Sequence, residues 1–258
     1  MEKRILLFAV CPMLLLVISM SFSGCTGNIG GIKRVSGEDL MVGIEADTSA
    51  TNTAILNENT VSVTDFAMRL FQKSVMEEES NVLVSPLSVI NALAMTANGA
   101  KGETLSQMEE VFGVDVPGLN NYLHTYIKGL PTGDKFKLSI ANSIWFRDDE
   151  RFTVEPDFLQ ANANWYGAGM YKAPFDNSTL KAINKWVEEK TDGMIKDILD
   201  EIPKDAVMYL VNALAFDAEW DSIYYDHQVR DGEFTKEDGE KQKIELMYSE
   251  EGKYLTDD

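Results

Sequence analysis

Apolar residues recur at helical spacing through much of the first half of the chain. The first such stretch begins near Val61, where Ser62 or Thr64 can cap a helix. A second helix is predicted directly after Ser85-Pro86, because a serine hydroxyl caps helices and proline suits the first helical turn. The same spacing predicts further helices over residues 104–113, 119–127, 158–165 and 178–190.

Other stretches show the patterns of β-strands. Phe136 to Phe146 alternates apolar with polar residues, which indicates a strand with one covered face. Ala206 to Phe216, AVMYLVNALAF, is apolar on both alternating faces, which predicts a central strand covered on both sides. Asn212 interrupts this strand, and an unpaired buried amide is costly, so we expect it to join a hydrogen-bond cluster. Short strands over residues 81–84 and 243–248 complete an α+β pattern, and the residues between Asp217 and the last strand are predicted to form a polar loop.

The first residues have the layout of a signal peptide. Lys3 and Arg4 precede an apolar run from Ile5 to Met20, which is shorter than the roughly 20 residues of a membrane-spanning helix. We therefore predict a signal peptide over residues 1–24 and an exported protein, located outside the cell or on the outer face of a membrane.

Cys25 directly follows this predicted signal peptide. The segment Phe22-Ser23-Gly24-Cys25 resembles the lipobox of prokaryotic lipoproteins, although Phe22 stands where leucine is usual. Cys11 is the only other cysteine, so an exported chain would carry one thiol and no internal disulfide. Lipidation of Cys25 explains the lone thiol, and a lipid there would be the one contact with a membrane. The alternative is a freely secreted protein in which Cys25 is incidental.

Composition separates a linker from a single globular domain. Residues 25–60 are mostly polar and small and lack an apolar period, so we predict a flexible tether there and one domain over 61–258. The chain has 42 acidic and 23 basic residues and a net charge of -19, which argues against nucleic acid as a partner.

The chain offers little equipment for catalysis. His124 and His227 are its only histidines, and it has neither a Gly-x-Ser-x-Gly elbow nor a His-Glu-x-x-His helix. We therefore expect a protein that is not an enzyme and that needs no cofactor or metal.

Three ordered segments carry a family resemblance. They are NVLVSPLSV with its continuation NGAKGETLSQM, INKWVEEKTDGMIKDIL from Ile183, and LVNALAFDAEW from Leu210. Together they resemble the serpins, in the order and spacing of that family, over roughly Val61 to the end of the chain. The resemblance implies amino-terminal helices packed on a large mixed β-sheet. It also implies inhibition of serine, or alternatively cysteine, endopeptidases, in which a cleaved bait loop inserts as a new strand into the main sheet.

The resemblance also assigns roles to particular residues in the opening of the sheet. Ser85, Ser88 and Asn212 match a polar latch beneath the sheet, while Trp220 and Phe234 match the region where the loop enters. Ser85 as a plain helix cap and Trp220 as a core aromatic residue are the simpler alternatives. The helix in front of the sheet, which must move for insertion, is matched by Asn184, Thr191 and Gly193.

The serpin pattern extends beyond the end of this sequence. The resemblance places the carboxy-terminal part of the fold, the bait loop and its reactive bond after Asp258, so we expect none of them in this chain. Without those strands, residues 206–216 are expected to have an unpaired edge and an uncovered apolar face. A non-inhibitory serpin scaffold with a binding, storage or chaperone role, or an inactive fragment, remains an alternative to an inhibitor.

Overall fold

A computed structural model describes residues 37–47, 55–77, 81–131, 133, 135–220 and 224–250, and the backbone of residues 5–10. The helices are α1 (Ile55–Glu77), α2 (Pro86–Ala97), α3 (Gly102–Phe112), α4 (Val116–Lys128), α5 (Pro156–Tyr166) and α6 (Asn177–Lys190), with a short 3-10 helix at Asp226–Gln228. The strands are β1 (Ile5–Val10), β2 (Glu38–Asp39), β3 (Phe136–Arg147), β4 (Gly169–Ala173), β5 (Met208–Ala218), β6 (Val229–Thr235) and β7 (Lys241–Met247).

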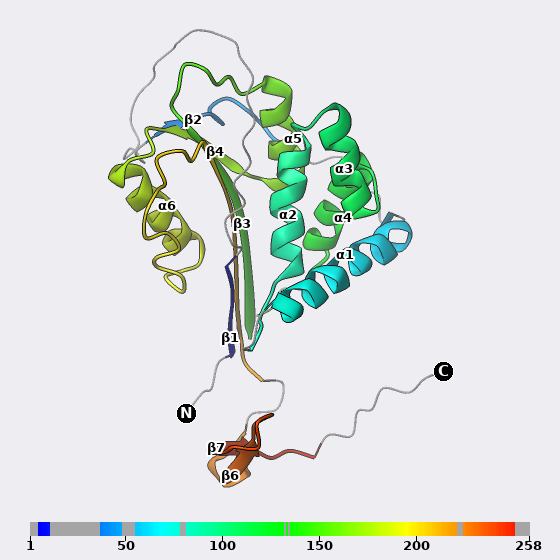
Figure 1. The fold of residues 1–258 in the computed structure, drawn as a ribbon, viewed down its shortest axis with the longest axis vertical. Helices are drawn as coiled ribbons and strands as arrows, with labels where there is room; N and C mark the ends of the chain where they lie inside the picture. The colour runs from blue at the N-terminus through cyan, green and yellow to red at the C-terminus, as the bar shows by residue number, and fades with distance from the viewer. Residues whose placement is uncertain are drawn as a thin grey trace.

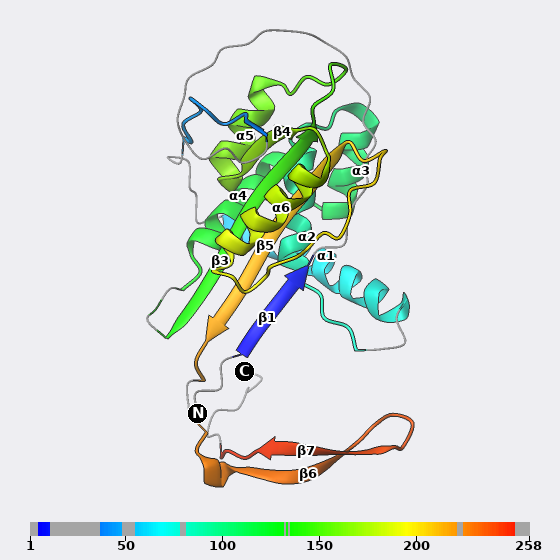
Figure 2. The same ribbon diagram turned by 90° about the vertical axis from the view of Figure 1, so that its left-hand side faces the viewer.

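Helices cover both faces of a mixed sheet in the order β1-β5-β3-β4-β2. β5 runs antiparallel to β3 and β1, β4 runs parallel to β3, and β2 runs antiparallel to β4. Figure 1 shows α1 to α5 on one side of this sheet and α6 on the other side, and Figure 2 looks onto the face that α6 covers. β6 and β7 form a separate antiparallel hairpin. The predicted α+β fold, with amino-terminal helices on a mixed sheet, is confirmed.

Local sequence explains where the main helices begin and end. The side chains of Ser85, Asp115 and Asp176 cap α2, α4 and α6 by accepting hydrogen bonds from backbone N–H groups. α3 and α5 end at Gly113 and Gly167, whose φ angles of 70° and 54° lie in the left-handed region that glycine adopts without strain. These caps fix the lengths of the helices that pack on the sheet.

The alternation of side chains along β3 and β5 divides the interior into two apolar clusters. Ile144 on β3 and Leu210 on β5 join the cluster under α1 to α5. Trp145 and Val211, one residue further along each strand, join the cluster under α6. Both faces of β5 are therefore covered, as its double apolar pattern predicts, and the expectation of an uncovered apolar face is wrong.

Part of the predicted tether is structured. Within residues 25–60, Glu38–Asp39 forms β2, and α1 already begins at Ile55 rather than near Val61. Leu40 and Met41 pack against the helix-side cluster, so two apolar residues anchor a segment whose composition resembles that of a linker. The prediction of a flexible tether therefore does not hold for residues 37–47 and 55–60.

Two shorter segments differ from the sequence prediction. Residues 81–84, predicted as a short strand, form neither helix nor strand, whereas Val229–Thr235, predicted as part of a polar loop, forms β6. β6 and β7 pair over their full lengths, from Val229 opposite Met247 to Thr235 opposite Lys241. β6 was missed because its side chains are mostly exposed and polar, so it has no apolar alternation.

The outer edge of β5 is partly occupied. Ile5–Val10 pairs with Ala213–Ala218, which contradicts the expectation of a wholly unpaired edge. Within the described ranges, no helix is long and apolar enough to cross a membrane.

Candidate functional site at the centre of the sheet

Two buried asparagines face each other in the middle of the sheet. Asn142 on β3 is the register partner of Asn212 on β5, and each side chain is only 5% exposed. The Asn212 Nδ2 donates to Asn142 Oδ1 at 2.7 Å, while Asn142 Nδ2 donates to the Tyr166 carbonyl at 3.1 Å. Asn212 Oδ1 has no hydrogen-bond partner in the described structure. The predicted hydrogen bonding of Asn212 is confirmed, but one of its acceptors stays open.

Ser85 and Ser88 form the start of α2 on the same side of the sheet. Ser85 Oγ lies 3.0 Å from Ser88 Oγ and accepts a hydrogen bond from the Ser88 N–H at 3.3 Å. Ser88 is 1% exposed, and α2 packs against β5. No hydrogen bond of the described residues joins either serine to Asn212. The structure thus shows the helix-cap role of Ser85, and the three-residue latch stays a prediction.

The two residues assigned to the region where the loop enters lie on different elements. Trp220 follows the end of β5, is partly exposed and contacts the Tyr224 ring edge-to-face at 5.8 Å. Phe234 lies on β6 in the separate hairpin, with its side chain exposed. None of the interactions described for this structure joins these two residues. Their shared role at the loop stays a prediction.

The residues assigned to the front helix lie on α6 and on the turn that follows it, and their role in the opening of the sheet stays a prediction. Asn184 on α6 holds the segment after the helix, since its Oδ1 accepts from Ile198 N at 3.1 Å and Leu199 N at 3.0 Å. Its Nδ2 donates to the Leu199 carbonyl at 2.8 Å. Thr191, fully buried at the end of α6, donates to the Val187 carbonyl at 2.8 Å and accepts from Ile195 N at 3.0 Å. Gly193 has a φ of 77°, which favours glycine at this turn.

Three residues near the site were not identified from the sequence. They are Asn142, Tyr166 and Asn120, all buried on the helix side of the sheet. The Tyr166 hydroxyl donates to Asn120 Oδ1 at 2.5 Å, and burial raises the pKa of this phenol well above its ordinary value, so it remains a donor. One signal was present: Asn142, like Asn212, is an amide at a position where the strand pattern calls for an apolar residue.

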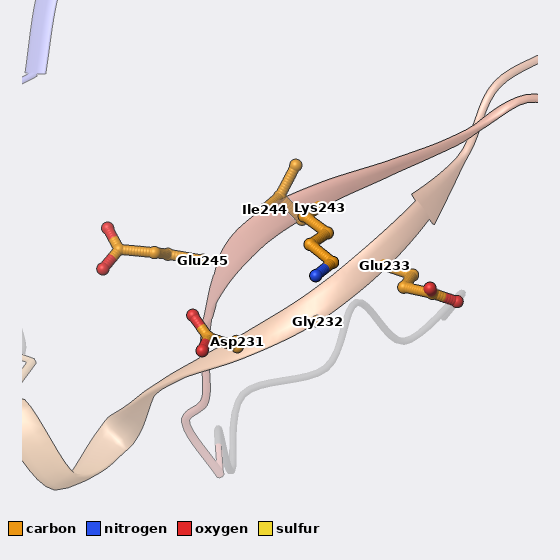
Figure 3. Close-up of a pocket in the computed structure, with 6 residues that line it drawn as sticks. All are labelled: Asp231, Gly232, Glu233, Lys243, Ile244 and Glu245. Atoms are coloured by element: carbon orange, nitrogen blue, oxygen red, sulfur yellow. The ribbon is translucent and has the colours of Figure 1, made fainter.

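The β6–β7 hairpin carries a shallow groove lined mostly by charged residues. It is lined by Asp231, Gly232, Glu233, Lys243, Ile244 and Glu245. Figure 3 shows that its charged side chains spread outward rather than converge on one point. Within the described ranges, no three histidine, cysteine, aspartate or glutamate side chains lie close enough together to hold a metal ion.

The two histidines lie apart from the centre of the sheet. His124 on α4 is 9% exposed, its Nδ1 lies 3.0 Å from the Trp165 carbonyl, and its ring meets the Trp165 ring edge-to-face. His227 lies in the short 3-10 helix and stacks on Tyr225. Both contacts are structural.

Comparison with known proteins places this architecture in one family. The family model described as serpin (serine protease inhibitor) matches residues 61–258. Human neuroserpin is 28% identical over 200 residues, which are 73% of this chain and 48% of neuroserpin. Human serpin B8 is 33% identical over 196 residues, or 72% of this chain and 51% of serpin B8. Emu (Dromaius novaehollandiae) ovalbumin is 28% identical over 207 residues, 72% of this chain and 53% of its own.

Solved structures give the same result. The native state of tengpin, a thermophilic serpin, matches with a TM-score of 0.76 and 44% identity, over 83% of this chain and 55% of that chain. Its latent state matches with a TM-score of 0.66 and 46% identity, over 79% and 54% of the two chains. The chain spans about half the length of the curated relatives it matches. Because the family model covers most of the sequence, the chain belongs to the serpin family.

Proposed function

We propose that this chain supplies the amino-terminal half of an exported serpin that traps serine, or alternatively cysteine, endopeptidases by inserting its cleaved bait loop beside β5. The observation that carries the proposal is the setting of β5. Its two faces are covered by α2 and α6, and its outer edge accepts an antiparallel strand over Ala213–Ala218. Cleaved serpin loops insert by this kind of strand addition.

The strand that occupies this edge supports the proposal further. Ile5–Val10 lies within the predicted signal peptide. Removal of that peptide on export would free the outer edge of β5. β5 itself would stay in place, because β3 and the helices on both faces of the sheet hold it. Lipidation of Cys25, which lies outside the described residues, would then hold the inhibitor at the outer face of a membrane; without it the inhibitor would be freely secreted.

The experiment joins this chain to the second half of a known serpin. The chain is linked after Glu250 to the carboxyl-terminal part of tengpin that the match leaves uncovered. The 258-residue chain and the joined chain are each incubated with trypsin-like, chymotrypsin-like and subtilisin-like enzymes and with a papain-like cysteine protease. Proteases with a blocked nucleophile serve as controls, because a trapped acyl-enzyme requires that nucleophile.

We expect a denaturant-resistant covalent complex from the joined chain with at least one active protease. The 258-residue chain and the blocked proteases should give none. Cleavage of the joined chain without any covalent complex would contradict the proposal, because it would show that this half does not support loop insertion. A covalent complex from the 258-residue chain alone would show that the remaining half is not needed.

A second candidate is a non-inhibitory scaffold that binds, stores or protects another molecule. The ovalbumins among the matched relatives favour it, because their presence shows that the likeness extends beyond proteins named as inhibitors. In the experiment above, this candidate predicts a joined chain that folds and is cut as an ordinary substrate. The loss or retention of the covalent complex therefore separates the two candidates.

A further inference from the structure

A line of hydrogen bonds runs from β5 through the helical layer to the end of α2. It continues from the Asn212–Asn142 pair through Tyr166, whose carbonyl accepts from Asn142 and whose hydroxyl donates to Asn120. Asn120 Nδ2 then donates to Asn98 Oδ1 at 2.7 Å, and Asn98 Nδ2 donates to the Ala94 carbonyl at 3.0 Å. We call Asn212, Asn142, Tyr166, Asn120 and Asn98 the polar relay.

The polar relay joins elements that are far apart in the sequence. Its members lie on β5, β3, α5 and α4 and at the carboxyl end of α2, and Figure 1 shows these helices together on one side of the sheet, opposite α6. Four members are less than 10% exposed: Asn212, Asn142 and Asn120 at 4–5% and Tyr166 at 9%. Asn98, at the far end, is partly buried. The relay therefore crosses the whole helix-side core.

The orientation of each amide in the relay is determined by its neighbours. At every step the residue nearer β5 donates and the next one accepts, and Asn98 also donates back to Asn120 Oδ1 at 3.2 Å. Turning one amide over would set two donors or two acceptors against each other. Asn212 Oδ1, which has no hydrogen-bond partner among the described residues, is the β5 end of this line.

We propose that Asn98, Asn120 and Tyr166 are positioning residues that tie the β3–β5 pair to the helical layer, so that the sheet opens at the outer edge of β5 and not between β3 and β5. This inference rests on the proposed function for its role in loop insertion. Apolar side chains could fill the same space without this directional link, and buried hydrogen-bond networks favour one arrangement of their elements over others. Loss of the hydrogen bonds at Asn98 should therefore raise the rate of hydrogen exchange in β5.

The test measures hydrogen–deuterium exchange of the full 258-residue chain by mass spectrometry, peptide by peptide. Asn98→Ala removes the end of the relay farthest from β5, at a position that is only partly buried. We expect exchange in the peptide covering β5 to rise roughly three- to ten-fold, as for the loss of one buried hydrogen bond. Asn121→Ala, on α4 but outside the relay, is the matched control and should leave β5 exchange within about two-fold of the wild type.

A second pair of variants tests the middle of the relay by removing single hydroxyl groups. Tyr166→Phe breaks the link to Asn120, whereas Tyr209→Phe removes a buried hydroxyl from β5 itself that has no hydrogen-bond partner in the described structure. We expect β5 exchange to rise in Tyr166→Phe and to stay at the wild-type level in Tyr209→Phe. The peptide covering α3, which contributes no residue to the relay, is the internal reference.

Several outcomes would overturn the inference. One is an Asn98→Ala chain in which exchange rises only near α2. Another is an equal rise at β5 and α3 in both relay variants, which indicates general destabilisation. The exchange measurement uses no protease. A negative exchange result therefore does not affect the trapping experiment, and a negative trapping result does not affect the exchange measurement.

Discussion

At the residue scale, hydrogen bonds from single polar side chains hold the segment after α6, which forms neither helix nor strand. The Asn184 side chain makes three hydrogen bonds to the backbone of Ile198 and Leu199, much as a neighbouring strand would. Thr191 does the same for the turn that leads to Ile195. α6 and the segment returning toward β5 are therefore held together by side-chain hydrogen bonds.

Replacement of Asn184 tests this role directly. Asn184→Ala leaves two backbone N–H groups and one carbonyl without their partners, so we expect a loss of about 2 kcal/mol in the free energy of unfolding. The measurement is urea unfolding followed by circular dichroism. Lys185→Ala, on the exposed side of the same helix, is the control and should change stability by less than about 0.5 kcal/mol. Equal midpoints for the two variants would show that water replaces the Asn184 hydrogen bonds without cost.

The sequence identified one half of the central asparagine pair and not the other. Asn212 stood out because it interrupts a strand that is apolar on both faces. Asn142 occupies an apolar position of an alternating strand, which is a weaker signal than an amide in a strand that is apolar on both faces, and only the register places it opposite Asn212. Register between distant strands depends on tertiary packing, and so do the contacts of Tyr166 and Asn120. Local patterns therefore predicted the need for a partner but not its identity.

At the element scale, the sequence predicted the long elements well and the edges poorly. α2, α6, β3 and β5 follow from apolar period and from caps such as Ser85. β2 was not predicted, because Glu38 and Asp39 are charged and lie in a mostly polar segment without an apolar period. Its backbone pairs with β4 through Glu38 opposite Lys172 and Asp39 opposite Tyr171. Short edge strands of this kind depend on the sheet they join.

Residues 37–47 act as a strap across the edge of β4 and onto α5. Leu40 N donates to the Met170 carbonyl at 2.9 Å, and Asp47 N donates to Asn164 Oδ1 at 2.9 Å. Gln160 Nε2 on α5 donates to the Glu45 carbonyl at 2.8 Å. The strap therefore covers a sheet edge that would otherwise be open to pairing with another chain.

Truncation of the two apolar strap residues should release it. Leu40→Ala combined with Met41→Ala removes the contacts with the helix-side cluster, so we expect a loss of about 2 kcal/mol in unfolding free energy. Hydrogen–deuterium exchange at β4 should rise in the same variant. Val42→Ala is the matched control, since Val42 is 82% exposed, and should change neither quantity. Identical behaviour of the double variant and the control would show that the strap is not held in solution.

At the scale of the whole molecule, the described residues form a packed body and a hairpin that differ in how they are held. The body has two apolar clusters, one on each side of the sheet. The β6–β7 hairpin is a sheet of its own, drawn apart from the body in Figures 1 and 2, and Phe234, Leu246 and Met247 are exposed on it. Two-stranded ribbons are marginally stable alone, so this hairpin needs a further surface to pack on.

Limited trypsin digestion should distinguish the hairpin from the body. We expect early cleavage after Arg230, Lys236 and Lys241 on the hairpin of the 258-residue chain, because the exposed ribbon opens readily. Arg147 should resist, because its guanidinium donates to the carbonyls of Ala206 at 2.7 Å and Lys204 at 3.0 Å and fixes the end of β3.

The chain joined to the tengpin segment supplies the comparison. If the hairpin packs against the remaining serpin elements, cleavage within residues 229–247 should slow at least about ten-fold in the joined chain, since access then requires undocking. Cleavage of the body should change little, because apolar clusters already cover both faces of β5. Equal hairpin cleavage in both chains would contradict this view and would show that the exposed apolar residues of the hairpin face a different surface.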